Sequence, residues 1–208
     1  MHTDQQSPGR PSYITTVDHV KFCTVPTPYR QITEVPEYRF GDIRPEDTVI
    51  DIGANAGAFA IRAARLSNHV VAVEPVTCGL LQENIRLNGV EGVVQVVCGA
   101  LGDGSPARVQ WDGRAVTVPT YTLQDIRAIA GGCDFLKCDC EGAEWGIDPA
   151  DLAGIRRIEM ELHLPPICRE VNMALLDAIS RQYGFTLDRV PCHGPLGLMG
   201  YLHAERKC

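Results

Sequence analysis

Two glycines and two acids occur at spacings that suit the binding of a nucleoside-type ligand. Residues 49–59 read Val-Ile-Asp-Ile-Gly-Ala-Asn-Ala-Gly-Ala-Phe, so a β-branched run ends in Asp51 and a turn with Gly53 and Gly57. Glycine has no Cβ, so the backbone of such a turn can approach a ligand closely. Glu74 ends the next apolar run, where a carboxylate can accept both hydroxyls of a ribose. The pattern therefore predicts a ribose-bearing ligand.

The spacing of the glycines separates the classes of nucleoside ligand. A dinucleotide turn needs Gly-x-Gly-x-x-Gly, but Gly53 and Gly57 stand four apart with Asn55 between them, and the chain has no Gly-x-x-x-x-Gly-Lys-Ser/Thr phosphate loop. Asp51 would repel a pyrophosphate but suits a cationic amine. A ligand with an amino-acid end and a ribose end fits best, which indicates S-adenosylmethionine; a tight turn without a ligand is the alternative. The predicted cofactor-binding residues are Asp51, Gly53, Ala54, Asn55, Gly57 and Glu74.

Charged residues interrupt two predicted strands that otherwise suit the centre of a sheet. Fully buried parallel strands should be apolar on both faces, and charges there are costly unless they pair or face a cleft. Ligands of open α/β sheets bind beyond the carboxyl ends of the strands. One strand carries Lys137, Asp139 and Glu141 on one side, and the next carries Glu159, Glu161 and His163. We expect the walls of a reaction site at Asp139, Glu141, Glu161 and His163.

The predicted catalytic residues are Asp139, Glu161 and His163. Asp139 begins the loop where the cofactor and a methyl acceptor should meet, with a helix-capping acid as the alternative. His163 and Glu161 suit a base and its orienting carboxylate, because histidine titrates near neutrality. A satisfied polar pair at a strand end is the alternative for them. Lys137 is expected to pair with Glu159 or Glu161, since buried lysines need a partner.

Two further predictions concern helix geometry and metals. Glu144 is expected to be a first-turn acid of a short helix. A divalent metal is a chemically reasonable addition, because carboxylates and imidazole suit Mg, Mn or Fe, but we predict none. Its ligands would be Asp139, Glu141, Glu161 and His163.

The nine cysteines are interpreted as reduced thiols that pack as small hydrophobic residues. Their number is odd, they form no Cys-x-x-Cys pair, and no secretory signal precedes them. A zinc or iron–sulfur site is the alternative, although the spacings match no usual ligand pattern. Such a site would use Cys133, Cys138, Cys140 and Cys168.

Composition bounds the class of protein. A chain of 208 residues suits one full core, which we place at 46–208, after a tail at 1–12 and a small lid with strands at 13–45. The net charge of −7 argues against broad nucleic-acid binding. The longest apolar runs are too short to span a bilayer, and the polar first residues do not form a signal peptide. We therefore expect a cytoplasmic protein without membrane contact.

Strands and helices alternate from residue 48 onward, which predicts an α/β three-layer sandwich with a mostly parallel sheet. Expected strands span 48–52, 70–73, 93–98, 134–139 and 158–163, with one or two short strands in 13–25. Expected helices span 57–66, 77–88, 123–130 and 169–183, with a short interrupted helix at 143–152. Hairpins are expected at 108–111 with 115–118 and at 186–190 with 198–204.

With these residues in view, the chain resembles the FkbM family of S-adenosylmethionine-dependent methyltransferases from about Arg44 to His163. The most specific segment is Leu-Lys-Cys-Asp-Cys-Glu-Gly-Ala-Glu at 136–144, which is similar to the family's Leu-Lys-x-Asp-x-Glu-Gly-x-Glu. The first motif at 44–57, with its Asn55, is also distinctive. Further similar segments lie at 73–75, 84–88, 99–103 and 158–163.

The resemblance implies a Rossmann-like class I methyltransferase fold, whose seven-stranded, mostly parallel sheet has an antiparallel last strand. It places Ala100 and Leu101 along the adenine of the cofactor. It implies O-methylation of a small-molecule acceptor, often a sugar or a secondary metabolite. The chain departs from the family at the two cysteines that flank Asp139, where a bulkier aliphatic is common. The short region before Arg44 implies a small lid and an open site.

Other functions stay open at the level of the sequence. A tRNA or nucleobase methyltransferase is disfavoured, because amino-methylating enzymes of this fold resemble Asn/Asp-Pro-Pro-Tyr where this chain has Asp-Cys-Glu-Gly. An open site would also admit a protein side chain, and a homo-oligomer or a protein partner is compatible with it. A non-catalytic cofactor-binding protein is disfavoured by the charged strand ends at Asp51, Glu74 and Asp139.

Overall fold

A computed structural model of the chain describes residues 13–23, 33–111, 114–188 and 198–207. The predicted tail at 1–12, residues 24–32 of the predicted lid and the end of the predicted strand 186–190 lie outside the described residues. Within the described ranges, no helix combines the length and the apolar character that crossing a membrane requires.

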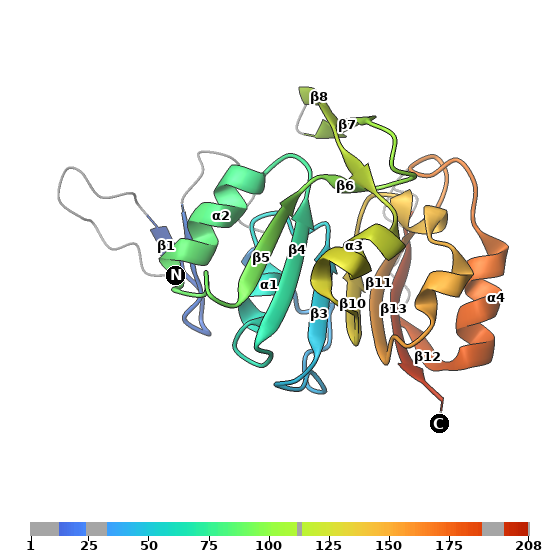
Figure 1. Ribbon diagram of the computed structural model, residues 1–208, viewed down its shortest axis with the longest axis horizontal. Helices are drawn as coiled ribbons and strands as arrows, with labels where there is room; N and C mark the ends of the chain where they lie inside the picture. The colour runs from blue at the N-terminus through green and yellow to red at the C-terminus, as the bar shows by residue number, and fades with distance from the viewer. Residues whose placement is uncertain (1–12, 24–32, 112–113, 189–197, 208) are drawn as a thin grey trace.

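A seven-stranded sheet forms the centre of the molecule (Figure 1). Its order is β12-β13-β11-β10-β3-β4-β5, and β13 is antiparallel to both of its neighbours while the other pairings are parallel. This confirms the predicted three-layer architecture and the antiparallel last strand. The strands are β3 (Thr48–Ile52), β4 (His69–Glu74), β5 (Val94–Cys98), β10 (Phe135–Cys138), β11 (Arg157–His163), β12 (Tyr183–Asp188) and β13 (Leu198–Arg206).

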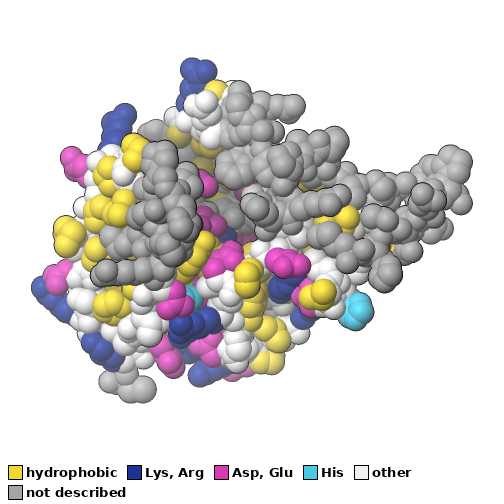
Figure 2. Space-filling model, turned by 180° about the vertical axis from the view of Figure 1, so that it is seen from behind, with side chains coloured by type: hydrophobic (Ala, Val, Ile, Leu, Met, Phe, Trp, Pro, Cys, Tyr) yellow, Lys and Arg dark blue, Asp and Glu magenta, His cyan; other side chains and the backbone are white. Residues whose placement is uncertain are grey.

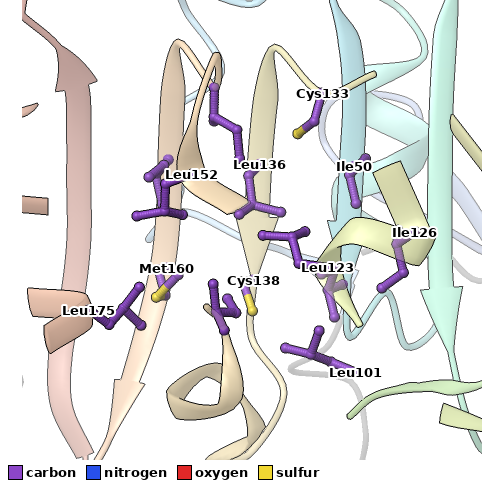
Figure 3. Close-up of a cluster of buried hydrophobic side chains, with 14 of the residues drawn as sticks. Ile50, Leu101, Leu123, Ile126, Cys133, Leu136, Cys138, Leu152, Met160 and Leu175 are labelled. Atoms are coloured by element: carbon purple, nitrogen blue, oxygen red, sulfur yellow. The ribbon is translucent and has the colours of Figure 1, made fainter. Parts of the chain in front are cut away.

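Two hydrophobic clusters cover opposite faces of this sheet. Because side chains alternate along a strand, Ile50 points into one cluster and its neighbour Val49 into the other. Helix α3 (Leu123–Ala130) and helix α4 (Met173–Gln182) contribute to the first, part of which is drawn in Figure 3. Helix α1 (Ala58–Ala63) and helix α2 (Cys78–Leu87) contribute to the second. Figure 1 accordingly shows α1 and α3 on opposite sides of the sheet.

Three two-stranded sheets complete the fold. The early strands β1 (Tyr13–Thr15) and β2 (Lys21–Cys23) are antiparallel, and amides of β2 donate to Asn84 and Asn88 around α2. The short strands β6 (Ala100–Leu101) and β9 (Thr120–Tyr121) are parallel. Between them, β7 (Ala107–Trp111) and β8 (Arg114–Val118) form the predicted antiparallel hairpin.

The helix predicted at 169–183 is wrong at both of its ends, whereas the interruption predicted at Pro149 in the short helix at 143–152 is confirmed. The helix expected at 169–183 begins at Met173, because the Asn172 side chain caps it by accepting from the Leu175 amide, and Tyr183 already opens β12. The segment 143–152 forms two separate 3₁₀ helices, η2 (Ala143–Gly146) and η3 (Pro149–Leu152). Pro149 cannot donate to a continuing helix, and Asp148 starts a new one by accepting from the Ala150 amide.

The cysteine prediction is wrong for one pair. Cys78 at the start of α2 and Cys98 at the end of β5 form a disulfide. The parallel pairing of β4 with β5 sets Glu74 opposite Cys98, which brings the start of α2 close to that strand end. Among the described residues, the free cysteines are Cys23, Cys133, Cys138, Cys140 and Cys168, and no group of three metal-ligating side chains there includes a cysteine.

The segment at 33–47 packs against the sheet on the side of α1, over β11. The Arg39 amide donates to Glu159 at 3.0 Å, and Asp42 lies 3.2 Å from the Arg156 guanidinium. On this face, seen from behind in Figure 2, acidic and basic side chains lie interleaved across the middle of the molecule. The charged residues of the central strands are therefore covered by chain from the N-terminal part.

Candidate functional site

A cavity of about 390 Å³ opens at the carboxyl ends of β3, β4, β5 and β10. Its volume lies in the range of small-molecule sites. It has an apolar wall around Val76 and Leu101 and acids at Glu74 and Asp139. The residues that line it are Ile52, Gly53, Asn55, Val73, Glu74, Pro75, Val76, Gly99, Ala100, Leu101, Ala107, Arg108, Val109, Gln110, Asp139, Cys140, Glu141 and Ala143.

The glycines of the turn after β3 are needed first for the protein's own packing. Gly53 has φ +76°, and a Cβ there would lie 1.7 Å from the carbonyl oxygen of Asp139. Gly57 has φ +91°, and a Cβ there would lie 2.8 Å from Leu81. The turn thus presses against the loop that carries Asp139. Gly53 and Asn55 still line the cavity, so the predicted turn is beside the ligand space.

Glu74 fastens this turn to the loop that follows β4. One carboxylate oxygen accepts from the Asn55 amide at 2.9 Å, and the other accepts from the amides of Val76 at 2.7 Å and Thr77 at 2.8 Å. A carboxylate has about four acceptor positions, so about one is left for a ligand hydroxyl. Glu74 lines the cavity, where a ligand hydroxyl could reach it, but much of its hydrogen-bonding capacity shapes the cavity wall.

Asp51 lies behind the cavity wall, where it forms an ion pair with Lys137. Its side chain is fully buried, and Lys137 Nζ lies 3.1 Å from its Oδ1 and 3.0 Å from the Gly53 carbonyl oxygen. The prediction that Lys137 pairs with Glu159 or Glu161 is wrong. The register of β10 sets Lys137 between Asp51 and Glu159, but Glu159 is already paired with Arg157 and His203.

Asp139 lies where the ion pair meets the cavity. Its Oδ2 accepts a hydrogen bond from the Tyr38 hydroxyl at 3.0 Å and lies 3.8 Å from Lys137 Nζ. Its side chain is 28% exposed, whereas Asp51 is inaccessible, so Asp139 is the one of the two that a ligand can reach. Burial acts to lower the pKa of Lys137, but Asp51 and Asp139 raise it above its ordinary value, so the ammonium stays charged.

Glu161 pairs with Asp139. Burial, the charge of Asp139 and the hydrogen bond to it raise the pKa of Glu161 to about 9. At neutral pH Glu161 therefore keeps its proton and donates a hydrogen bond to the Asp139 carboxylate.

His163 has a different carboxylate partner from the predicted one. Its Nδ1 lies 3.0 Å from Oε1 of Glu144, which also accepts from the His163 amide, and its Nε2 lies 3.5 Å from Glu141. Glu144 is in the first turn of η2, as predicted, but it is fully buried, and its other oxygen accepts from the Gly142 amide. Burial acts to lower the pKa of His163, but the hydrogen bond and charge of Glu144, with Glu161 and Glu141, raise it to about 9. The imidazole is charged at neutral pH.

Three of the four candidate metal ligands lie together. Asp139, Glu141 and His163 each offer one ligand atom, and these atoms lie within 4.8 Å of one another. Glu161 is not in that group.

The sequence reasoning missed the residues that reach the site from distant parts of the chain. Tyr38 comes from the segment at 33–47, and Tyr201 from β13 packs edge-on against its ring at 5.9 Å. Arg108 and Gln110 reach the cavity from the β7–β8 hairpin. The only signal in the sequence was the aromatic character of the early segment, which has no spacing that links it to Asp139.

A family model described as "Methyltransferase FkbM domain" matches residues 51–187, which is most of the described sheet and the whole of the cavity wall. A ribosomal protein L11 methyltransferase from Pelotomaculum thermopropionicum is 39% identical over 89 residues, which are 41% of this chain and 27% of that protein. The chain therefore matches about a quarter of the length of this curated relative.

Solved structures of methyltransferases share the fold. An O-methyltransferase from Bacillus cereus in complex with SAH superposes with a TM-score of 0.51 at 17% identity, over 77% of this chain and 74% of that one. An rRNA methylase from Streptococcus thermophilus gives 0.52 at 10% identity, over 79% and 90% of the two chains. At these identities the likeness shows the fold alone, which is the Rossmann-like class I methyltransferase fold.

The buried ion pair of Asp51 with Lys137 should contribute far more to the free energy of unfolding than an exposed ion pair does. We expect Asp51→Ala to lower the free energy of unfolding by about 3–5 kcal/mol, because it leaves Lys137 buried without its nearest counter-ion. The control substitution Asp177→Ala removes an exposed ion pair with Arg181 and should lower the free energy of unfolding by at most about 0.5 kcal/mol. Urea unfolding of both variants measures the difference, and equal losses would contradict the assignment.

Stability should fall as the pH rises from about 6.5 to about 9. The ordinary pKa values of His163 and Glu161 are 6.5 and 4.5, and folding raises both to about 9. Each group therefore contributes its full stabilisation when the pH is below its ordinary pKa, and this stabilisation is lost as the pH rises towards 9. Urea unfolding across this range should show the decline. His163→Gln and Glu161→Gln should each flatten it; an unchanged slope in both variants would rule out this origin.

Proposed function

The chain belongs to the FkbM methyltransferase family, and on that premise we propose that it transfers the methyl group of S-adenosylmethionine to a hydroxyl group of a small molecule. One feature of the structure supports this proposal most directly. The same cavity is lined by Glu74, which suits a ribose, and by Asp139, which lies in the segment at 136–144 that resembles the family most specifically. Cofactor and reacting groups would thus meet within one space.

The residues of the cavity fit the proposed cofactor. Glu74 retains about one acceptor position for a ribose hydroxyl, and Val76, Ala100 and Leu101 provide an apolar wall for an adenine. Asp139 and Glu141 supply negative charge for a cationic amino-acid end. The spacing suggested that Asp51 contacts the amine of the cofactor directly. Instead, Asp51 would support the turn indirectly, because it pairs with Lys137, whose ammonium contacts the Gly53 carbonyl.

Asp139 is the proposed general base. When bound, S-adenosylmethionine supplies a sulfonium that is already an activated methyl donor, so the protein needs to position the acceptor and remove its proton. Asp139 is partly exposed at the cavity, and Tyr38 and Lys137 lie against its Oδ2. These contacts leave acceptor positions for a substrate hydroxyl, whose proton would pass to the carboxylate.

Glu161 and His163 would support this base rather than replace it. Both carry their proton at neutral pH, so neither is available to accept one. Glu161 would hold the Asp139 carboxylate by its hydrogen bond. His163 would balance the charges of Glu141 and Glu144 and fix the loop after β10. This assigns the three predicted catalytic residues three different roles.

Cofactor binding should depend on Glu74. We expect Glu74→Gln to weaken S-adenosylmethionine binding about ten- to a hundredfold, because hydrogen bonds to a charged group are worth about 1.5–3 kcal/mol. Isothermal titration calorimetry measures the effect. Glu91→Gln changes an exposed glutamate outside the cavity and serves as the control. Unchanged affinity in Glu74→Gln would contradict the ribose assignment.

The acceptor class can be tested without knowing the acceptor. The protein is incubated with S-adenosylmethionine that carries a deuterated methyl group and with a cell extract divided into small molecules, RNA and protein. We expect labelled small molecules with the wild type and none with Asp139→Asn. Label in the RNA or protein fraction alone would favour a macromolecular acceptor. No label in any fraction, despite cofactor binding, would favour a non-catalytic binding protein.

A further inference from the structure

Tyr38 connects the N-terminal segment to the reaction site. Its hydroxyl donates to Oδ2 of Asp139 at 3.0 Å, although the two residues are 101 positions apart in the chain. Tyr38 is only 5% exposed, so this hydrogen bond is shielded from water. Burial and the charge of Asp139 raise the pKa of Tyr38 well above its ordinary value. The phenol therefore stays protonated and acts as a donor.

The ring of Tyr38 is held on three sides. It packs edge-on against Phe59 of α1 and Tyr201 of β13, each with ring centroids 5.9 Å apart, and Lys137 Nζ lies 5.3 Å from its centroid. Edge-to-face aromatic contacts and a cation over the ring both fix its orientation. The direction of the hydroxyl is therefore set by packing and does not depend on Asp139 itself.

The segment that carries Tyr38 is anchored next to this residue. The Arg39 amide donates to Glu159, the Arg39 side chain pairs with Asp188, and Phe40 stacks on Phe59 with centroids 4.7 Å apart. Glu159 is fully buried on the sheet, so the amide contact is well shielded. The segment thus presents one hydroxyl at a defined position against the partly exposed Asp139.

We propose that Tyr38 is a positioning residue for Asp139, which holds its carboxylate in the orientation that faces the cavity. This inference rests on the proposed function, in which Asp139 accepts the substrate proton. The Tyr38 hydroxyl donates to Oδ2 of Asp139, and its ring is fixed by packing. The hydrogen bond therefore fixes the orientation of the carboxylate, and with it the direction of the acceptor positions that stay open. The segment at 33–47 is then part of the reaction site as well as a cover for the sheet.

The test compares Tyr38→Phe with Tyr183→Phe. Tyr183 is also buried, but its hydroxyl lies against the backbone carbonyls of Leu152 and Ile155, and its ring belongs to the hydrophobic cluster on the opposite face of the sheet from Tyr38. Each variant loses one buried hydroxyl and keeps its ring. Turnover is measured as S-adenosylhomocysteine formed with the small-molecule extract, and cofactor affinity is measured by calorimetry. The titration of the Asp139 and Glu161 carboxyl groups is followed by carbon-13 NMR. Their signals are assigned by their absence in Asp139→Asn and Glu161→Gln.

Tyr38→Phe should lower turnover about tenfold while the cofactor dissociation constant stays within about twofold, since one hydrogen bond near the reacting group is lost. It should also move the titration of the Asp139–Glu161 pair to higher pH, because a donor to the ionised form is gone. Tyr183→Phe should change neither. An unmoved titration in Tyr38→Phe, or a moved titration with wild-type turnover, would overturn the positioning role.

Failure of the proposed function and failure of the positioning role of Tyr38 give different results. If wild-type protein forms no S-adenosylhomocysteine with the extract, the proposed function fails, and the titration alone decides whether Tyr38 orders Asp139. If Tyr38→Phe does not fold, 3-fluorotyrosine at position 38 keeps the ring and makes its hydroxyl a stronger donor. That substitution should move the titration of the pair to lower pH, and an unmoved titration would again overturn the inference.

Discussion

The ammonium group of Lys137 connects the parts of the site. It lies 3.1 Å from Asp51, 3.0 Å from the carbonyl oxygen of Gly53 and 3.8 Å from Asp139, so one buried cation holds the end of β3, the turn that follows it and the loop after β10 together. A buried charge must be paired, because its desolvation costs several kcal/mol. The two acids meet this requirement, and only Asp139 remains open to a ligand.

The same constraint explains how charges are distributed around the site. Among the residues that the structure describes, carboxyl groups outnumber cations near Asp139, and Glu161 relieves the excess of negative charge because it carries a proton at neutral pH. The Glu144–His163 pair then stabilises the far end of the loop. The segment at 33–47 covers this polar face, and its Tyr38 adds a hydrogen-bond donor to Asp139.

The sequence predicted what depends on local spacing. The strand ends, the turn at Gly53 and the acids at Glu74 and Asp139 lie where alternation and motif spacing placed them, because parallel strands bring their carboxyl ends to one edge. The contacts between residues on different elements were harder to predict from the sequence. Lys137 has an acid beside it on each neighbouring strand, and only the three-dimensional pairing of Glu159 with Arg157 and His203 decides between them. Long-range contacts such as Tyr38 with Asp139 leave no periodic signal.

We propose that the cavity between Glu74 and Asp139 is the cofactor site of this protein. A crystal structure of the protein soaked with S-adenosylhomocysteine tests it most directly. We expect density for the nucleoside beside Glu74, with the thioether end directed toward Asp139. Density at another place on the protein, or an empty cavity at a saturating ligand concentration, would contradict it.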